Sequence, residues 1–195
     1  MTEMNAQFRP ATSDDAIEMA ELVNSAGDGL PLYLWAKTAR PGQSAWDVGR
    51  ERARRGSGGF AYDNTVIREN DGKTTACLIG YPLGNGLGAT DEEVPAMLVP
   101  LLELESLVPS SWYVNVLATY PEHRGKGFAT ELLRIAETRA TDAGCERICL
   151  IVSDTNNLAR RLYEKCGFGE RATRPIVKED WEHSGQNWVL LAKDL

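Results

Sequence analysis

Two stretches of the chain carry residue types that suit anion binding and proton transfer. The first covers residues 120–129, where Gly125 and Gly127 alternate with Arg124 and Lys126. Glycine lets an anion approach the backbone closely, and the two basic side chains add positive charge. The second stretch covers residues 156–168 and contains polar side chains, a small residue and a tyrosine, whose phenol can donate a proton. Together they predict a site for an extended anionic ligand with a reactive end.

The elements around the first stretch would place its backbone at a helix start. A strand is expected at 112–119, and a helix from about 127 to 143 follows the loop. The first turn of such a helix presents unpaired N–H groups and the positive end of its dipole, so the loop should cradle a pyrophosphate. It matches neither a Walker A loop nor a dinucleotide fingerprint. The alternative is a basic turn that only caps the helix. One face of this helix should be apolar, with Ala129, Leu132, Leu133, Ala136 and Ala140.

The second stretch predicts a helix over about 156–166. At ~100° per residue, Asn156, Ala159 and Tyr163 share one stripe, and the first and last of these are separated by a rise of ~10 Å. Gly167 should end the helix in a left-handed conformation, followed by a hydrophobic contact from Phe168. In the alternative interpretation Asn156 only caps the helix and Tyr163 only packs. A neighbouring stripe, expected to pack on the sheet, contains Leu158, Leu162 and Cys166.

Both stretches resemble the GNAT superfamily of N-acetyltransferases. Arg124-x-x-Gly127-x-Ala129 matches the family pattern Arg/Gln-x-x-Gly-x-Gly/Ala, and residues 156–168 match Asn-x-x-Ala-x-x-Leu-Tyr-x-x-x-Gly-Phe at every position. The resemblance is specific over 112–168, and before that only the order of the elements agrees. It implies an α/β (α+β) GNAT fold, with a central mixed sheet of six to seven strands flanked by helices. A helical insertion precedes the fourth strand, and residues 1–195 form a single domain.

The resemblance implies acetyl-CoA as cosubstrate, without a metal, and direct attack of an amine on the thioester in a ternary complex. Backbone N–H groups of the fourth strand, near Leu117, would stabilise the carbonyl oxygen. Tyr163 matches the general acid, because a phenol of pKa ~10 keeps its proton at neutral pH and can protonate the leaving thiolate. By resemblance the residues that bind acetyl-CoA are Leu117, Ala118, Thr119, Arg124, Gly125, Lys126, Gly127, Phe128, Ala129, Thr130, Asn156 and Ala159.

The group that deprotonates the amine stays open. Many family members place a glutamate near the start of the fourth strand, and counting from Arg124 that position is about Tyr113, with Asn115 next on the same face. Neither side chain is a convincing base. The open alternatives are ordered water and four residues of flanking segments, Glu103, Glu105, Asp180 and His183. His123 belongs to the phosphate loop, and a surface role is expected for it.

Residues 27–35 are the expected acceptor side, since the region between the first two helices commonly lines the acceptor pocket in this family. Asp28 would pair with a cation, while Tyr33 and Trp35 would pack against the acceptor. Tyr113 and Asn115 are further candidates for contact with the acceptor. In the alternative interpretation the aromatic rings belong to the core and Asp28 to a turn.

Composition and charge limit the partners. The 195 residues are 43% hydrophobic, and the formal net charge is -7. This charge argues against nucleic acid and anionic membranes as partners and is compatible with a cationic amine. No signal peptide or membrane span is expected. The four cysteines include no Cys-x-x-Cys pair, which favours reduced thiols in a cytoplasmic protein over a zinc site.

The remaining pattern predicts the other elements of the fold. A strand ends near Phe8–Ala11, a helix runs from about Thr12 to Gly27, and residues 27–42 read as a loop with short helical pieces. Further on we expect a helix at 44–55 with Ser44 as its cap, strands at 60–69 and 74–82, a glycine-rich loop at 83–89, a helical insertion at 91–107, and strands at 147–152, 168–174 and 187–192.

Two functions remain in view. The first is an N-acetyltransferase that acts on an amine of a small molecule or peptide, and Tyr163 favours it. The alternative is a non-catalytic acyl-CoA-binding regulatory module, which the missing glutamate favours. Family members often form dimers, so a homodimer is possible, but the residues fix neither the oligomeric state nor the acceptor or the length of the acyl chain.

Overall fold

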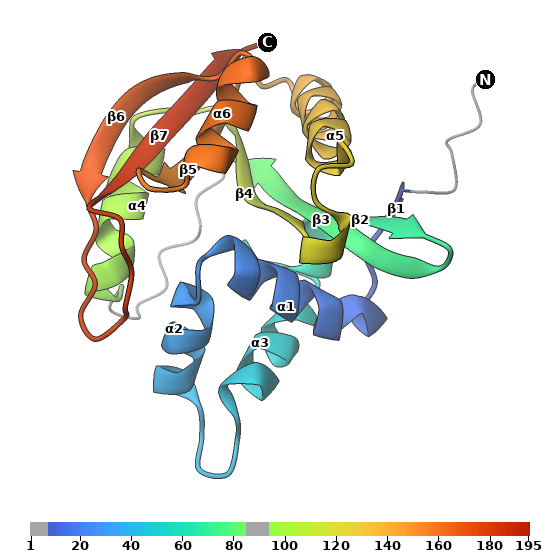
Figure 1. Ribbon diagram of the computed structural model, residues 1–195, viewed down its shortest axis with the longest axis vertical. Helices are drawn as coiled ribbons and strands as arrows, with labels where there is room; N and C mark the ends of the chain where they lie inside the picture. The colour runs from blue at the N-terminus through green and yellow to red at the C-terminus, as the bar shows by residue number, and fades with distance from the viewer. Residues whose placement is uncertain (1–7, 85–93) are drawn as a thin grey trace. The chain divides into compact units, whose positions relative to one another are not determined.

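The computed structural model describes residues 8–84 and 94–195, and its elements follow the predicted order (Figure 1). The strands are β1 Phe8–Pro10, β2 Thr65–Asn70, β3 Lys73–Pro82, β4 Trp112–Thr119, β5 Arg147–Ser153, β6 Gly169–Pro175 and β7 Asn187–Asp194. The α-helices are α1 Ala16–Ala26, α2 Leu30–Thr38, α3 Ala45–Ala53, α4 Val99–Ser106, α5 Phe128–Asp142 and α6 Asn157–Lys165. Short 3-10 helices are η1 Ser13–Asp15, η2 Tyr62–Asn64, η3 Ala96–Leu98 and η4 Pro121–His123.

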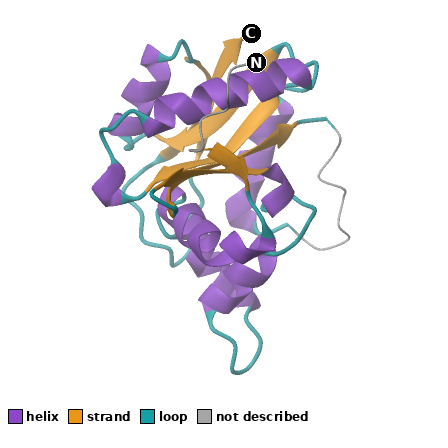
Figure 2. Cartoon of the chain, turned by 90° about the vertical axis from the view of Figure 1, so that its right-hand side faces the viewer, coloured by secondary structure: helices purple, strands orange, loops and turns teal. Residues whose placement is uncertain are grey.

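The strands form one seven-stranded mixed sheet in the order β1-β2-β3-β4-β5-β7-β6. Figure 2 shows these strands in orange and the helices that flank them in purple. The predicted α/β class with a mixed sheet of six to seven strands is therefore confirmed. No helix of the described residues is long and apolar enough to cross a membrane.

The chain divides into two compact units. Unit 1 contains Met1–Gly80 and Val116–Leu133, and unit 2 contains Tyr81–Asn115 and Arg134–Leu195. The elements β3, β4 and α5 each begin in one unit and end in the other. The single domain at 1–195 stays a prediction.

Unit 1 is built on the antiparallel strands β1, β2 and β3. Its core includes Met19 and Leu22 of α1, Trp35 of α2 and Ile67 of β2, all buried. The helix α3 begins where predicted, because the Ser44 hydroxyl accepts the backbone N–H of Asp47 at 3.2 Å in a capping box. Figure 1 shows α1, α2 and α3 grouped together, with a loop joining the last two.

Unit 2 contains the parallel pair of β4 and β5, which starts at Trp112 opposite Ile148. β7 lies antiparallel to β5 along its whole length and pairs with β6 on its other side. The helix α4 packs on β6 and β7. The core of this unit includes Leu104, Ile148, Leu150 and Leu190, all buried.

Two expectations about local structure need correction. Residues 30–38 form one continuous helix rather than short pieces, because Pro31 stands in the first turn, where a missing N–H and a fixed φ cost nothing. Leu158 does not pack on the sheet and is 76% exposed. It lies about 140° around α6 from the buried Tyr163, whereas Ala159 lies only about 40° away. Most of the predicted glycine-rich loop and the start of the insertion, at 85–93, lie outside the described residues.

Candidate functional site

The predicted anion cradle lies at the start of α5 in unit 1. Gly125 and Gly127 adopt φ of 76° and 87°, a left-handed region that strains other residues. Among the described residues, no atom beyond the glycine and its two chain neighbours lies within 4 Å of the place a Cβ would take at Gly125 or Gly127, so open space adjoins the backbone there. A helix that begins at Phe128 leaves its first N–H groups without intrahelical partners. The N–H of Glu131 is the first to close a turn, onto the carbonyl of Gly127 at 3.1 Å.

Contacts within unit 1 hold this loop to the end of β4. The Arg124 Nε donates to the carbonyl oxygen of Thr119 at 3.2 Å. The Tyr120 hydroxyl donates to Glu21 of α1 at 2.6 Å, and the Tyr120 N–H donates to the carbonyl of Thr75 at 3.0 Å. The sequence predicted the loop but none of these anchors, and the two partners of Tyr120, Glu21 and Thr75, lie far away along the chain.

Arg68 is a residue that the sequence analysis missed. It is 4% exposed, and its guanidinium lies 3.2 Å from the centre of the Phe128 ring. Its Nε donates to Glu131 at 3.1 Å. Both partners belong to the first turn of α5, so a buried cation fixes the turn that presents the N–H groups. The Phe128 ring is therefore engaged by Arg68, while the backbone of this residue stands at the start of α5.

The part of β4 that belongs to unit 1 offers backbone rather than side chains. Ala118 is buried in the core, while Leu117 and Thr119 are half-buried. The Cys77 thiol of β3 is hydrogen-bonded to the backbone of Ala118, and its burial raises the pKa of this thiol to about 12. The thiol is thus protonated and inert at neutral pH.

The residues of this loop fit a pyrophosphate. The loop combines open space beside two glycines, the first N–H groups of a helix, and two exposed cations, Arg124 and Lys126. The Lys126 ammonium also lies 3.4 Å from the Nδ1 of His123 in the same loop. Such a surface can bind an anion by charge and by backbone hydrogen bonds.

The second motif forms the start and end of α6 in unit 2. The Asn156 Oδ1 accepts the N–H of Ala159 at 3.1 Å and caps the helix. At the other end Gly167 has φ of 90°, and the N–H of Phe168 donates to the carbonyl of Tyr163 at 3.0 Å. This is a Schellman ending, as predicted. The Asn156 side-chain oxygen therefore caps the helix, which is the structural alternative for this residue.

Tyr163 is 8% exposed, and its ring lies 5.9 Å from that of Phe168. Burial raises the pKa of the Tyr163 hydroxyl to about 12. The phenol therefore holds its proton at neutral pH, which a proton donor requires. Its role as general acid stays a proposal.

Unit 2 also brings Tyr113 of β4 against Glu105 of α4. The two side chains are hydrogen-bonded, and the Tyr113 ring meets that of Tyr81 edge-on with centroids 5.8 Å apart. Burial raises the pKa of the Glu105 carboxyl to about 7, although the hydrogen bond from Tyr113 lowers it. The same burial keeps the pKa of Tyr113 well above its usual range. The sequence predicted no base at Tyr113, and the structure places there a phenol that is hydrogen-bonded to the Glu105 carboxyl.

The other candidate bases have different surroundings. Glu103 pairs with Arg174 of β6 at 2.7 Å. His183 stacks on Trp181 with ring centroids 4.4 Å apart, and its Nδ1 accepts the N–H of Gly185 at 3.0 Å. Asp180 is exposed. Each of these side chains is thus either committed to a structural contact or exposed to solvent.

The residues predicted on the acceptor side differ in burial. Trp35 is 3% exposed and packs between Trp46 and Phe60, which corresponds to the core alternative for this ring. Tyr33 is half-buried beneath the ammonium of Lys37, which lies 4.6 Å from its ring. Asp28 is exposed in a turn with φ of 48°, and Asn115 is exposed on β4. Contact of any of these residues with an acceptor stays a prediction.

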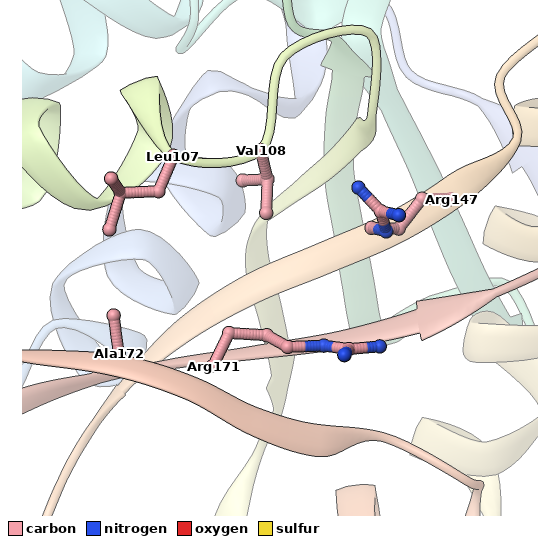
Figure 3. Close-up of a pocket in the computed structure, with 5 residues that line it drawn as sticks. All are labelled: Leu107, Val108, Arg147, Arg171 and Ala172. Atoms are coloured by element: carbon pink, nitrogen blue, oxygen red, sulfur yellow. The ribbon is translucent and has the colours of Figure 1, made fainter.

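A cavity of about 350 Å³ lies elsewhere in unit 2 (Figure 3). Its two guanidinium groups already contact Asp194, from Arg147 at 2.8 Å and from Arg171 at 3.5 Å. We therefore assign it no ligand. The cavity is lined by Leu107, Val108, Arg147, Arg171 and Ala172.

Comparison with known proteins places these features in a family. The model of the acetyltransferase (GNAT) family matches residues 32–168. A spermidine N(1)-acetyltransferase of Vibrio cholerae is 39% identical over 74 residues, which cover 37% of this chain and 42% of that protein. An uncharacterized N-acetyltransferase of Methanocaldococcus jannaschii is 35% identical over 82 residues, covering 42% of this chain and 50% of that protein. The chain thus spans half or less of the length of these curated relatives.

Solved structures agree with the fold. An N-acetyltransferase from Staphylococcus aureus Mu50 has a TM-score of 0.67 at 19% identity, covering 96% of this chain and 100% of that one. Another acetyltransferase has a TM-score of 0.67 at 21% identity, covering 97% and 99%. At this identity the likeness shows the fold alone.

Proposed function

Because the chain belongs to the acetyltransferase (GNAT) family, we propose that it transfers an acetyl group from acetyl-CoA to a primary amine. One observation carries this proposal. Gly125 and Gly127 open the backbone at the start of α5 to an anion, next to Arg124 and Lys126. That arrangement suits the pyrophosphate of coenzyme A.

The proposal gives each group a role. The backbone of 125–130 holds the pyrophosphate, and Leu117, Ala118 and Thr119 bind acetyl-CoA along β4, with a backbone N–H near Leu117 facing the carbonyl oxygen. Asn156 and Ala159 bind acetyl-CoA from α6. Tyr163 protonates the departing thiolate, and its phenol, with a pKa of about 12, holds that proton at neutral pH.

The acceptor is proposed as a cationic primary amine of a small molecule or peptide. The net charge of -7 suits such a substrate, and the Vibrio cholerae relative is a spermidine acetyltransferase. Asp28 and Tyr33 are the proposed acceptor contacts of unit 1, and Tyr113 and Asn115 those of unit 2. A cytoplasmic location and a homodimer stay predictions.

The experiment is a transfer assay combined with calorimetry. Acetyl-CoA binding is measured first, and acetyl transfer is then assayed with polyamines, amino acids, peptide N-termini and aminoglycosides. Acetyl-CoA binding together with acetylation of at least one amine is the expected result. Tight binding without transfer to any amine would instead identify a non-catalytic acyl-CoA-binding module.

Tyr163→Phe tests the proton donor. We expect kcat to fall about 100-fold, because removing a general acid costs on the order of 10² to 10⁴ in rate, while the acetyl-CoA Kd stays within about twofold. Tyr62→Phe, which also removes one phenolic hydroxyl, serves as the control. Equal kcat values for the two variants would remove Tyr163 from the mechanism.

A further inference from the structure

We propose that Glu105, held in place by Tyr113, accepts the proton that the acceptor ammonium must lose before it attacks. This inference rests on the proposed function. It names a base outside the fourth strand, where many family members carry a glutamate and this chain has Tyr113. Glu105 would be the catalytic base that touches the substrate, and Tyr113 a positioning residue.

The geometry combines a helix and a strand of the same unit. Glu105 stands in the last turn of α4 and is half-buried, whereas Tyr113 is buried near the start of β4. The hydrogen bond between them leaves the carboxylate with further lone pairs, since an ionised carboxylate has about four acceptor sites. The edge-on contact with Tyr81 of β3 fixes the Tyr113 ring from the other side. A partly exposed carboxylate with a fixed orientation can thus receive a proton from outside.

The surrounding charges single out Glu105 as the group that titrates. Burial raises the pKa of Cys149 to about 12 and raises that of Tyr81 and Tyr113 above their usual range, so these groups stay protonated at neutral pH. Three arginines of the same unit contact other carboxylates: Arg174 pairs with Glu103, and Arg147 and Arg171 pair with Asp194. With its pKa raised to about 7, Glu105 is ionised in a large share of molecules at neutral pH and is a far stronger base than an ordinary carboxylate.

The proton transfer balances. One N–H bond of the ammonium breaks, its proton goes to a Glu105 oxygen, and the nitrogen keeps the electron pair with which it attacks the thioester carbon. The C–S bond then breaks and the thiolate takes a proton from Tyr163. The nitrogen, positively charged after the attack, releases its second proton to water, and the Tyr163 phenolate takes a proton back from water. Glu105 ends as a neutral acid and returns its proton to water before the next cycle.

The test compares Glu105→Gln with Glu103→Gln, which removes the same charge two residues away on α4. We expect kcat/KM for an alkylamine at pH 8 to fall about 100-fold in Glu105→Gln and less than threefold in Glu103→Gln. The limb near pH 7 in the kcat/KM profile should disappear only in Glu105→Gln. Raising the pH toward about 10 should restore much of its rate, because the acceptor then loses its proton to water.

Tyr113→Phe gives a directional second readout. The hydrogen bond from Tyr113 lowers the pKa of Glu105, so its removal should move the limb of the profile to higher pH. A purely structural role for the pair would lower stability, measured by urea unfolding, without moving that limb.

The outcomes separate this inference from the proposed function. If the wild-type protein and Glu103→Gln bind acetyl-CoA and acetylate the amine while Glu105→Gln keeps a wild-type pH profile, the inference is wrong and the acetyltransferase stands. If the wild-type protein transfers no acetyl group to any amine, the proposed function fails and the inference falls with it.

Discussion

At the scale of single residues, burial makes one phenol and one carboxyl chemically distinct. Burial raises the pKa of Tyr163 to about 12, which suits a proton donor. Burial also raises the pKa of Glu105 to about 7, which suits a proton acceptor. Acid–base catalysis pairs a group that holds a proton with a group that accepts one. The surroundings of Tyr163 and Glu105 give the two side chains these different states. The cradle at Gly125 and Gly127 depends instead on backbone conformation.

Gly127→Ala tests that cradle. At φ of 87° an alanine is strained, and its methyl group would fill the open space beside the backbone. We expect acetyl-CoA to bind at least about tenfold more weakly by calorimetry, with a stability loss on the order of 1 kcal/mol.

Gly58→Ala is the matched control, because Gly58 also has a positive φ, 105°, and open space at its Cβ position. It should lose comparable stability and keep its affinity for acetyl-CoA. Equal affinities in the two variants would show that backbone strain, rather than contact with the ligand, explains any change.

At the scale of elements, the first turn of α5 is held by a residue of β2. Arg68 reaches Phe128 and Glu131 together, so one buried guanidinium sets the direction in which the helix start points. The same guanidinium donates a hydrogen bond of 3.3 Å to the hydroxyl of Thr75, which ties Arg68 to β3. The cradle therefore depends on the sheet as well as on its own loop.

Arg68→Met should loosen this turn. The ion pair and the stacking on Phe128 are lost while most of the apolar volume is kept. We expect a loss of about 1 to 3 kcal/mol in the free energy of unfolding, measured with urea, and weaker acetyl-CoA binding. Arg40→Met, which breaks an exposed pair with Glu51, should cost less than about 0.5 kcal/mol. Identical losses in both variants would contradict the special role of Arg68.

At the scale of the whole molecule, buried carboxyls couple stability to pH. The folded pKa of Glu105, about 7, exceeds its ordinary value of 4.5, so between these values the folded protein binds more protons than the unfolded one. Its contribution is therefore full below about pH 4.5 and is lost as the pH rises through 7. Asp15 acts in the opposite sense, because hydrogen bonding to Arg9 lowers its pKa and its contribution is lost in acid.

Urea unfolding at several pH values tests this linkage. Between pH 5 and pH 8 the free energy of unfolding of the wild-type protein should fall by on the order of 1 to 3 kcal/mol from Glu105. In Glu105→Gln the same curve should be flatter over this range. Parallel curves for the two proteins would mean that Glu105 has an ordinary pKa in the folded state.

The sequence by itself determined the features that depend on neighbours along the chain. The loop at 124–129, the Asn156 cap and the ending at Gly167 follow from φ preferences, capping and helical period, which act over a few residues. The mixed sheet was implied by the resemblance of two sequence motifs to the GNAT family.

The tertiary structure alone decided which side chains meet. Arg68 and Glu131 are 63 residues apart, and nothing local marks them as partners. Glu105 was one of several open candidates until packing placed it against Tyr113. Leu158 was assigned to a buried stripe because helical period gives the relative angles of side chains, whereas the direction of the buried face depends on what the helix packs against. Local patterns fix backbone conformation, but burial and the pKa values that follow from it arise only when distant segments pack together.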